Sequence, residues 1–365
     1  MQGRFFLPGP TEVRPEILAA MARQPVGHRG PELASLLADA DPRLRRVFGT
    51  TRPVYISTSS ATGLMEAAVR NGVRRRALAL VNGAFSGRFR ELVEAVGREC
   101  ETYEVPWGEA HSPDIVEERL SAGGFDAVVV VHSETSTGVL NPIREIAAAA
   151  RAAEGASGDD ILVMVDGVSS VGGVQVEPDE WGLDWLLTGA QKALALPPGL
   201  AFGSPSERLL RRAATIDGRG RYFDLLELDS YWERHQTPAT PAINLVYALA
   251  EQLRALDAEG MEARAARHIA MAELCWRWVD EVGSGFGMSI LASPGFRSPT
   301  VTAIQLPPTV TGPELAASMS AHGYTISPGY GKLKDTTIRI GHMGDHTVGE
   351  VEELLSALQG VMIDG

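Results

Sequence analysis

Two uninterrupted apolar runs, Ala127–Val131 and residues 161–165, set the first limit on the fold. Each is long enough for a β-strand and far too short for a membrane helix, and neither shows the polar alternation of a strand with one solvated face. Strands of this kind are typical of a mostly parallel sheet that helices cover on both sides. Other strand candidates alternate with helix candidates: strands at 54–56, 77–81, 100–105, 185–187 and 200–202, and helices at 64–71, 87–96, 114–122 and 143–154. This alternation predicts an α/β fold with a large, mostly parallel sheet.

The two ends of the chain differ from this central pattern. Pro8, Pro10 and Pro15 interrupt regular structure, so residues 1–15 are expected to form an N-terminal arm. Residues 204–240 carry both signs of charge without a clear period and are predicted to be irregular. After them come helix candidates at 241–259, 261–282 and 348–362 and strand candidates at 301–306 and 337–340. We therefore expect a large domain over 16–255 and a smaller α+β C-terminal domain over 256–365.

Composition excludes several classes of function. The net charge of −13 argues against a broad surface for nucleic acid or an anionic membrane, since both need clustered positive charge. The two cysteines, Cys100 and Cys275, do not have a metal-ligand spacing and do not suggest a disulfide framework. His342, Asp345 and His346 are residue types that bind metals, but no fourth ligand is evident, so we expect a loop and no metal site. With no apolar run of membrane-spanning length and no signal peptide, we expect a soluble, cytoplasmic protein.

Lys192 and Asp166 point to a specific chemistry. Lys192 lies among small and apolar residues with few charges nearby in the sequence, unlike a solvated surface lysine. Burial disfavours the ammonium form and makes such a lysine a usable nucleophile near neutral pH. Asp166 follows the apolar run 161–165, where a carboxylate at the mouth of a strand can keep a pyridine nitrogen protonated. Together the two residues predict pyridoxal 5'-phosphate held as a Schiff base on Lys192.

Polar clusters follow several of the predicted strands, where ligands of open α/β sheets bind. Residues 57–63 are rich in Ser and Thr and precede a helix, so their backbone N–H groups can receive a phosphate. Residues 82–88 include Phe85, an aromatic ring able to stack on a planar cofactor. Residues 132–138 are also polar, and Arg339 lies on an apolar strand before Gly341, which suits a bidentate contact with a carboxylate. Each cluster alone also fits an ordinary loop, helix cap or salt bridge.

In their order along the chain, these motifs resemble the class V (fold-type I) pyridoxal-phosphate-dependent aminotransferases, close to the alanine–glyoxylate, serine–glyoxylate and serine–pyruvate group. The resemblance runs from Leu7-Pro8-Gly9-Pro10-Thr11 to Arg339-Ile340-Gly341 and covers nearly the whole chain. It implies that Lys192 carries the cofactor and moves protons, and that Asp166 pairs with the pyridine nitrogen. It also implies the other cofactor contacts: Thr135 near the phenolic oxygen, Phe85 on the ring, and Ser60, Ala61, Thr62 and Gln191 at the phosphate.

The resemblance also carries expectations about the substrate and the assembly. Arg339 matches the anchor of the substrate α-carboxylate, and Gly9 is expected to contribute to substrate binding. The family forms homodimers with active sites at the subunit interface, and Thr240 in the segment 237–241 matches a residue that reaches the neighbouring subunit's phosphate site. We therefore expect a transaminase that moves an amino group from a small L-amino acid (alanine or serine) to a 2-oxo acid such as glyoxylate or pyruvate.

Three alternatives stay open at this stage. A cysteine desulfurase or β-lyase on the same scaffold requires a reactive cysteine, and neither Cys100 nor Cys275 is placed in an obvious mobile loop. A phosphoserine aminotransferase requires a second anion site, for which Arg29, Lys332 and Lys334 are candidates. A non-enzymatic role would make Lys192 and Asp166 a buried ion pair.

Overall fold

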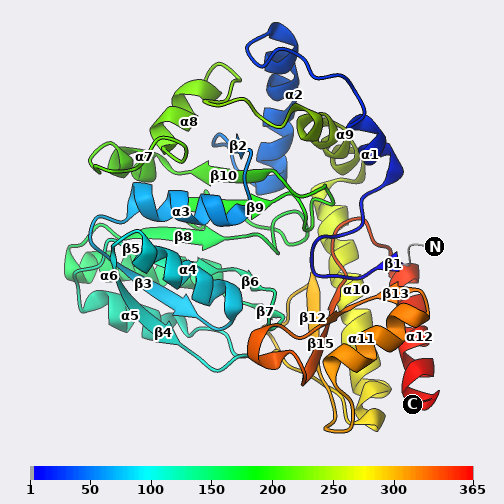
Figure 1. Ribbon diagram of the computed structural model, residues 1–365. Helices are drawn as coiled ribbons and strands as arrows, with labels where there is room; N and C mark the ends of the chain where they lie inside the picture. The colour runs from blue at the N-terminus through cyan, green and yellow to red at the C-terminus, as the bar shows by residue number, and fades with distance from the viewer. Residues whose placement is uncertain (1–3, 365) are drawn as a thin grey trace.

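The computed structural model describes residues 4–364, so that residues 1–3 of the expected arm and residue 365 lie outside the described part. Its main feature is a seven-stranded sheet, which crosses the large lobe in Figure 1. In spatial order its strands are β2 (Tyr55–Ser57), β10 (Ala201–Pro205), β9 (Trp185–Gly189), β8 (Leu162–Asp166), β5 (Ala127–Val131), β3 (Arg76–Val81) and β4 (Glu99–Glu104).

The predicted α/β fold with a mostly parallel sheet is confirmed. β9, β8, β5, β3 and β4 run parallel, and every residue of β5 and β8 is buried. β10 is the exception, since it pairs antiparallel with both β2 and β9. The apolar character of residues 200–202 predicts burial but carries no information on strand direction.

Helices cover both faces of the sheet, and their apolar sides form one core with it. They are α1 (Pro15–Ala20), α2 (Pro31–Phe48), α3 (Ala61–Gly72), α4 (Ala84–Ala95), α5 (Pro113–Ser121), α6 (Ile143–Ser157), α7 (Glu207–Ala213), α8 (Leu225–Trp232) and α9 (Ile243–Glu259). α3 and α4 each begin three residues earlier than predicted, so the polar residues before each apolar stretch form its first helical turn.

The prediction that residues 204–240 are irregular was wrong in part, because α7 and α8 lie there. Each begins at a residue whose side chain caps the helix: Ser206 accepts a hydrogen bond from the Leu209 N–H, and Asp224 accepts one from the Leu226 N–H. Caps of this kind stabilise short helices by satisfying N–H groups that have no partner within the helix. Because charged residues of both signs are frequent in this stretch, the apolar residues of the two short helices do not form a recognisable helical period.

A second, four-stranded antiparallel sheet forms the smaller lobe at the lower right of Figure 1. Its order is β11 (Ser289–Ile290), β12 (Val301–Gln305), β15 (Thr337–Gly341) and β14 (Ser327–Pro328), and it packs with α10 (Met261–Glu281), α11 (Gly312–Ala321) and α12 (Val348–Asp364). The remaining short elements are β1 (Arg4–Phe5), β6 (Ser133–Glu134), β7 (Val139–Leu140), β13 (Tyr324–Thr325) and the 3-10 turns Gly283–Phe286 and Gly331–Leu333.

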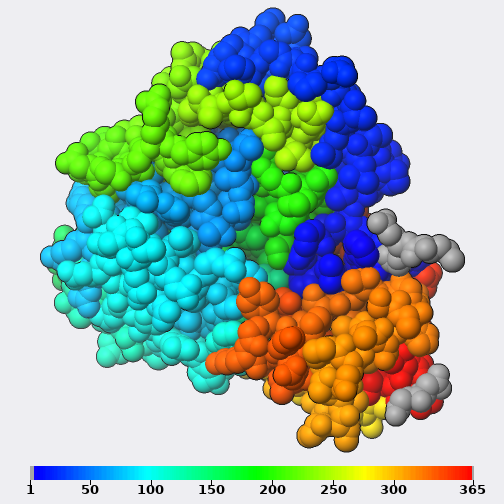
Figure 2. All heavy atoms as spheres, in the orientation of Figure 1, coloured from blue at the N-terminus to red at the C-terminus, as the bar shows by residue number. Residues whose placement is uncertain are grey.

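The N-terminal segment joins this smaller lobe to the large sheet. β1 pairs in parallel with β13, and Phe6 is fully buried in the apolar core of the smaller lobe. Figure 2 shows the following residues, in dark blue, lying between the green part of the large lobe and the orange part of the smaller one. The residues after Phe6 are thereby held against both lobes.

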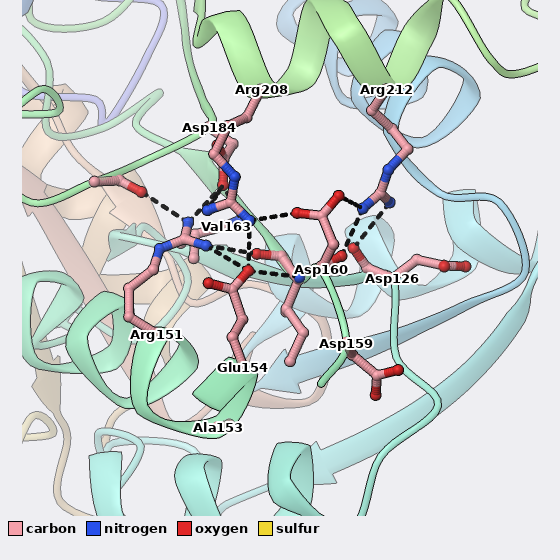
Figure 3. Close-up of polar contacts among 12 residues, drawn as sticks. Asp126, Arg151, Ala153, Glu154, Asp159, Asp160, Val163, Asp184, Arg208 and Arg212 are labelled. Atoms are coloured by element: carbon pink, nitrogen blue, oxygen red, sulfur yellow. Dashed lines mark hydrogen bonds and ion pairs between the residues drawn. The ribbon is translucent and has the colours of Figure 1, made fainter. Parts of the chain in front are cut away.

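A network of ion pairs ties the starting ends of the central strands (Figure 3). The Asp184 carboxylate, which is buried just before β9, accepts hydrogen bonds from Arg151 Nη2 at 2.6 Å and from the Val163 N–H at 2.9 Å. Arg212, whose side chain is buried, pairs through Nη2 with Asp160 Oδ2 at 2.6 Å. These contacts join α6 and α7 to the start of β8, which leaves the other end of the same strands, where Asp166 lies, free to form a site.

No helix within residues 4–364 has the length and apolar character needed to cross a membrane.

Candidate active site

A cavity of about 380 Å³ lies at the carboxyl ends of the parallel strands. It brings together residues that are far apart in the sequence, and nine of the predicted site residues line it: Gly9, Ser60, Ala61, Thr62, Phe85, Thr135, Asp166, Gln191 and Lys192. The topology explains the convergence, because each polar cluster follows a strand and the carboxyl ends of neighbouring parallel strands meet at one edge. Asp166 is the last residue of β8, and Lys192 follows shortly after β9.

Lys192 is buried, with 8% of its surface exposed. Burial lowers the pKa of its amine to about 8, and the positive charge of Arg339 acts in the same direction, against the carboxylates of Asp166 and Glu134. The amine donates a hydrogen bond to the carbonyl of Pro8, so the N-terminal segment contacts Nζ of Lys192. At pH 7 about a tenth of this lysine is therefore uncharged and able to act as a nucleophile or base.

Gly9 packs directly against the lysine side chain. A Cβ atom at this position would lie 2.5 Å from Cδ and 2.9 Å from Nζ of Lys192, and the backbone has φ of +102°. No residue other than glycine fits this approach without moving the lysine. The structure therefore places Gly9 beside the Lys192 amine.

The Asp166 carboxyl group faces the same cavity in an apolar setting. Burial raises its pKa to about 7, although Oδ1 accepts a hydrogen bond from the Val168 N–H at 2.7 Å. A cationic partner in the cavity would stabilise the ionised form of this carboxylate, because the partner would offset the hydration that burial removes. The site thus favours a ligand with a protonated nitrogen beside Asp166.

The first turn of α3 provides a place for an anion. Ser60 precedes the helix in an extended conformation, and its side chain makes no cap hydrogen bond. Since a helix N-terminus presents free N–H groups and a partial positive charge, the Ser60–Thr62 segment can accept a phosphate. Gln191 also lines the cavity, next in sequence to the lysine.

Arg339 lies beside the cavity on β15 and is 7% exposed. Its Nε donates to the Pro328 carbonyl at 3.2 Å and its Nη1 to the Thr135 carbonyl at 3.4 Å. Burial lowers the pKa of the guanidinium to about 10, and among residues 4–364 no carboxylate lies within 4.0 Å of it. A buried cation that donates to carbonyl groups and has no carboxylate partner among the described residues is suited to bind a carboxylate from outside.

The structure also brings in residues that sequence reasoning missed. Tyr330 and Arg88 line the cavity, and the Ser169 hydroxyl lies 2.5 Å from the Thr135 hydroxyl. Glu134 is fully buried behind them. Arg88 has a weak sequence signal, since it lies one helical turn after Phe85 in the polar cluster 82–88. Tyr330 has none, because it comes from the smaller lobe.

The remaining candidates lie elsewhere. Thr240 borders a separate cavity of about 320 Å³ between Thr58 and Tyr222, and Arg29 donates to the carbonyls of Thr237 and Pro238. Lys332 stacks over the ring of Trp107, 4.4 Å from its centroid. Neither Arg29 nor the two other lysines, Lys332 and Lys334, line the cavity around Lys192.

His342, Asp345 and His346, for which the sequence predicts a loop and no metal site, contact other groups of the protein. His342 Nε2 lies 2.9 Å from the Thr302 hydroxyl, Asp345 pairs with Arg264 at 2.9 Å, and His346 Nε2 lies 2.8 Å from the Phe5 carbonyl. Over residues 4–364 no group of three or more metal-binding side chains is placed to hold an ion.

Comparison with known proteins identifies the family of the chain. Residues 23–329 match the family model for the aminotransferases of class V. Relatives include the serine–glyoxylate aminotransferase of Methylorubrum extorquens, 33% identical over 94% of this chain and 87% of that protein. The L-aspartate–glyoxylate aminotransferase of Paracoccus denitrificans is 32% identical over 100% of this chain and 92% of that protein. Among solved structures, the alanine–glyoxylate aminotransferase of Nostoc sp. matches with a TM-score of 0.91 and 29% identity, covering 99% of this chain and 96% of that one.

Proposed function

Since this chain belongs to the class-V aminotransferase family and is therefore a transaminase, we propose that it uses pyridoxal 5'-phosphate to move the amino group of a small L-amino acid to a 2-oxo acid. Alanine and serine are the proposed donors, and glyoxylate and pyruvate the proposed acceptors. The observation that carries the proposal is the buried Lys192 amine, with a pKa lowered to about 8, in one cavity with Asp166.

The residues in the cavity fit this cofactor. Ser60, Ala61, Thr62 and Gln191 would hold its phosphate at the N-terminus of α3, Asp166 its ring nitrogen, and Phe85 and Thr135 its ring and phenolic oxygen. The glycine at position 9 supports the fit, because a side chain there would occupy the space of the lysine amine. When bound, pyridoxal phosphate supplies an aldehyde that condenses with amines and a ring that takes up negative charge from the substrate carbon.

The chain's own residues then have distinct tasks. Arg339 binds the α-carboxylate of the amino acid and fixes the orientation of its α-carbon. Lys192 Nζ in its neutral form accepts the α-proton and later returns a proton, a role that requires a pKa near the working pH. Asp166 stays ionised beside a cationic nitrogen and keeps the proton on that nitrogen. The oxo acid binds at the same Arg339 in the second half of the cycle.

We further propose that the protein is a homodimer in which Thr240 completes the phosphate site of the partner subunit. Thr240 borders a cavity of its own and lies apart from the cavity of Lys192, which supports a role in another subunit. The free Cys100 and Cys275 support a reducing compartment such as the cytoplasm. The two apolar cores support a division into an arm (1–15), a large domain (16–255) and a small domain (256–365).

The alternative functions find less support. A desulfurase needs a reactive thiolate, but burial raises the pKa of Cys100 to about 11 and that of Cys275 to about 12. The candidate anion site of a phosphoserine enzyme is not formed in the cavity by Arg29, Lys332 or Lys334. Lys192 and Asp166 do not form an ion pair within 4.0 Å, so a purely structural pair is not favoured either.

A donor–acceptor matrix tests the proposed function. The purified protein, loaded with pyridoxal phosphate, is mixed with L-alanine or L-serine alone, and the visible absorption band should shift without any oxo acid. Adding glyoxylate or pyruvate should restore the band, as ping-pong kinetics requires.

The lysine assignment has a sharp control, because the sequence contains just three lysines, at positions 192, 332 and 334. Borohydride reduction should fix the cofactor on Lys192 alone, as peptide mass spectrometry will detect. Lys192→Ala should abolish both the absorption band and turnover, while Lys332→Ala should keep both. A Lys192→Ala protein that retains the band and turnover would refute the assignment.

A further inference from the structure

The cavity holds more positive than negative charge. Lys192 and Arg88 line it and Arg339 borders it, whereas Asp166 is the one carboxylate among the described lining residues. None of the three cations has a carboxylate within 4.0 Å in the part of the chain that the structure describes. Such an excess of positive charge favours the binding of anionic ligand groups.

The nearby Glu134 does not supply the missing charge to Arg88. Its carboxylate is fully buried and accepts hydrogen bonds from the Ser86 N–H at 2.8 Å, the Ser86 hydroxyl at 2.9 Å and the Ser136 hydroxyl at 2.6 Å. These bonds hold the start of α4 against β6. With Asp166 assigned to the cofactor ring and Arg339 to the α-carboxylate, Arg88 is the cation without a partner.

Arg88 and Arg339 both contact the side chain of Tyr330. Arg88 Nη2 lies 3.5 Å from the Tyr330 hydroxyl, at the limit of a hydrogen bond, and its Cζ lies 5.0 Å from the centre of the Phe85 ring. Arg339 Cζ lies 5.5 Å from the centre of the Tyr330 ring. Tyr330 in turn packs on Phe85, with ring centres 5.3 Å apart. Both guanidinium groups therefore contact Tyr330, Arg88 at its hydroxyl and Arg339 over its ring, on the wall of the cavity where the cofactor ring is proposed to stack.

We propose that Arg88 and the Tyr330 hydroxyl form a second anion subsite, which binds the side-chain carboxylate of a dicarboxylic amino acid while Arg339 binds its α-carboxylate. L-Aspartate and L-glutamate have two carboxylates joined by a short carbon chain, which suits two guanidinium groups that contact the same tyrosine. The inference rests on the proposed transamination and adds a class of amino donor to it. Arg88 is in this view a specificity-determining residue.

Steady-state kinetics with the cofactor-loaded enzyme tests the subsite. The values of kcat/KM for L-aspartate, L-glutamate, L-alanine and O-phospho-L-serine are measured at fixed glyoxylate. The variants are Arg88→Gln, Arg88→Lys and Tyr330→Phe. Arg90→Gln is the control, because Arg90 is on the same helix but outside the cavity lining, with Glu91 at 3.7 Å.

We expect the wild-type enzyme to use a dicarboxylic donor. Arg88→Gln should lower the ratio of dicarboxylate to alanine kcat/KM by about 10- to 100-fold, since it removes a charge-assisted hydrogen bond. Arg88→Lys should retain part of that ratio because it keeps the charge, and Tyr330→Phe should lower it by about 3-fold to 10-fold. Arg90→Gln should leave it within about 2-fold. Turnover of alanine shows in each case that the variant is folded and loaded.

Four results would overturn the subsite. The first is a wild-type enzyme that uses alanine but neither aspartate nor glutamate, and the second is a preference for phosphoserine over both. The third is an equal loss for alanine and dicarboxylates in Arg88→Gln, which would place Arg88 in a task common to all donors. If no amino acid changes the absorption band, the proposed transamination itself fails, and the subsite with it.

Discussion

Replacing Arg264 with methionine is expected to destabilise the protein by about 4 kcal/mol. Arg264 lies on α10, and 1% of its side chain is exposed. Its guanidinium donates to the carbonyls of Gly172 (2.9 Å) and Ala193 (2.7 Å) and pairs with Glu259 (2.7 Å) and Asp345 (2.9 Å). Ala193 follows Lys192, and Gly172 belongs to the loop after Asp166. One side chain therefore ties both loops of the active site to the smaller lobe.

The size of the expected destabilisation depends on which partners of Arg264 would lose their hydrogen-bond donor. Asp345 keeps Arg14 Nε at 2.8 Å and Glu259 keeps Arg267 at 2.7 Å, so both carboxylates retain a cation. The carbonyls of Gly172 and Ala193 are buried, and each lost hydrogen bond costs about 1–3 kcal/mol when the acceptor stays unsatisfied. Two such carbonyls sum to about 4 kcal/mol, in the range of about 3–5 kcal/mol for breaking a buried ion pair. Methionine retains most of the aliphatic volume, which keeps the cavity contribution small.

Urea unfolding followed by tryptophan fluorescence measures the change in the free energy of unfolding. Arg254→Met is the matched control, because Arg254 is 53% exposed and pairs with Glu251 at the surface. It should change the free energy by no more than about 0.5 kcal/mol. A loss below about 1 kcal/mol for Arg264→Met would show that the two carbonyls find other donors, and would contradict the proposed link between the loops.

Two further predictions concern residues around the reactive amine. Gly9→Ala should lower kcat/KM by about 100-fold, because the added Cβ displaces Lys192. Gly97→Ala is its control, since Gly97 also has a positive φ but open space around it, and equal losses in both variants would refute the steric reasoning. Asp166→Asn should stabilise the cofactor-free protein at pH 8 while reducing turnover. The native carboxyl pKa of about 7 lies above the unfolded value of 3.8, so ionising Asp166 costs stability increasingly as the pH rises from about 4 to 7, by up to about 4 kcal/mol. The gain in unfolding free energy should therefore vanish near pH 4, and a gain of the same size at pH 4 and pH 8 would contradict this account.

Much of the fold could be predicted from local patterns. The runs at β5 and β8 are apolar throughout because both faces of each strand are buried. Burial on both faces can therefore be recognised from consecutive apolar residues in the sequence. The helices α7 and α8 could not be predicted in the same way, since each is short and charged and depends on one capping side chain. The direction of β10 was equally hidden, because an apolar strand has the same composition in either direction.

For the site, the sequence by itself determined the candidate groups: an amine at Lys192 among apolar neighbours, a carboxylate at the end of a buried strand, and a polar helix start suited to a phosphate. These depend on residues near one another in the chain, and the parallel topology brings their loops to one edge of the sheet. The tertiary structure alone decided what surrounds that chemistry. Three contacts join segments about 70 to 240 residues apart: Gly9 against Lys192, Arg88 at the Tyr330 hydroxyl, and Arg264 beneath both loops. Contacts at such separations leave no periodic signal in the sequence, because their geometry is set by how the two lobes pack and not by any local preference of the chain.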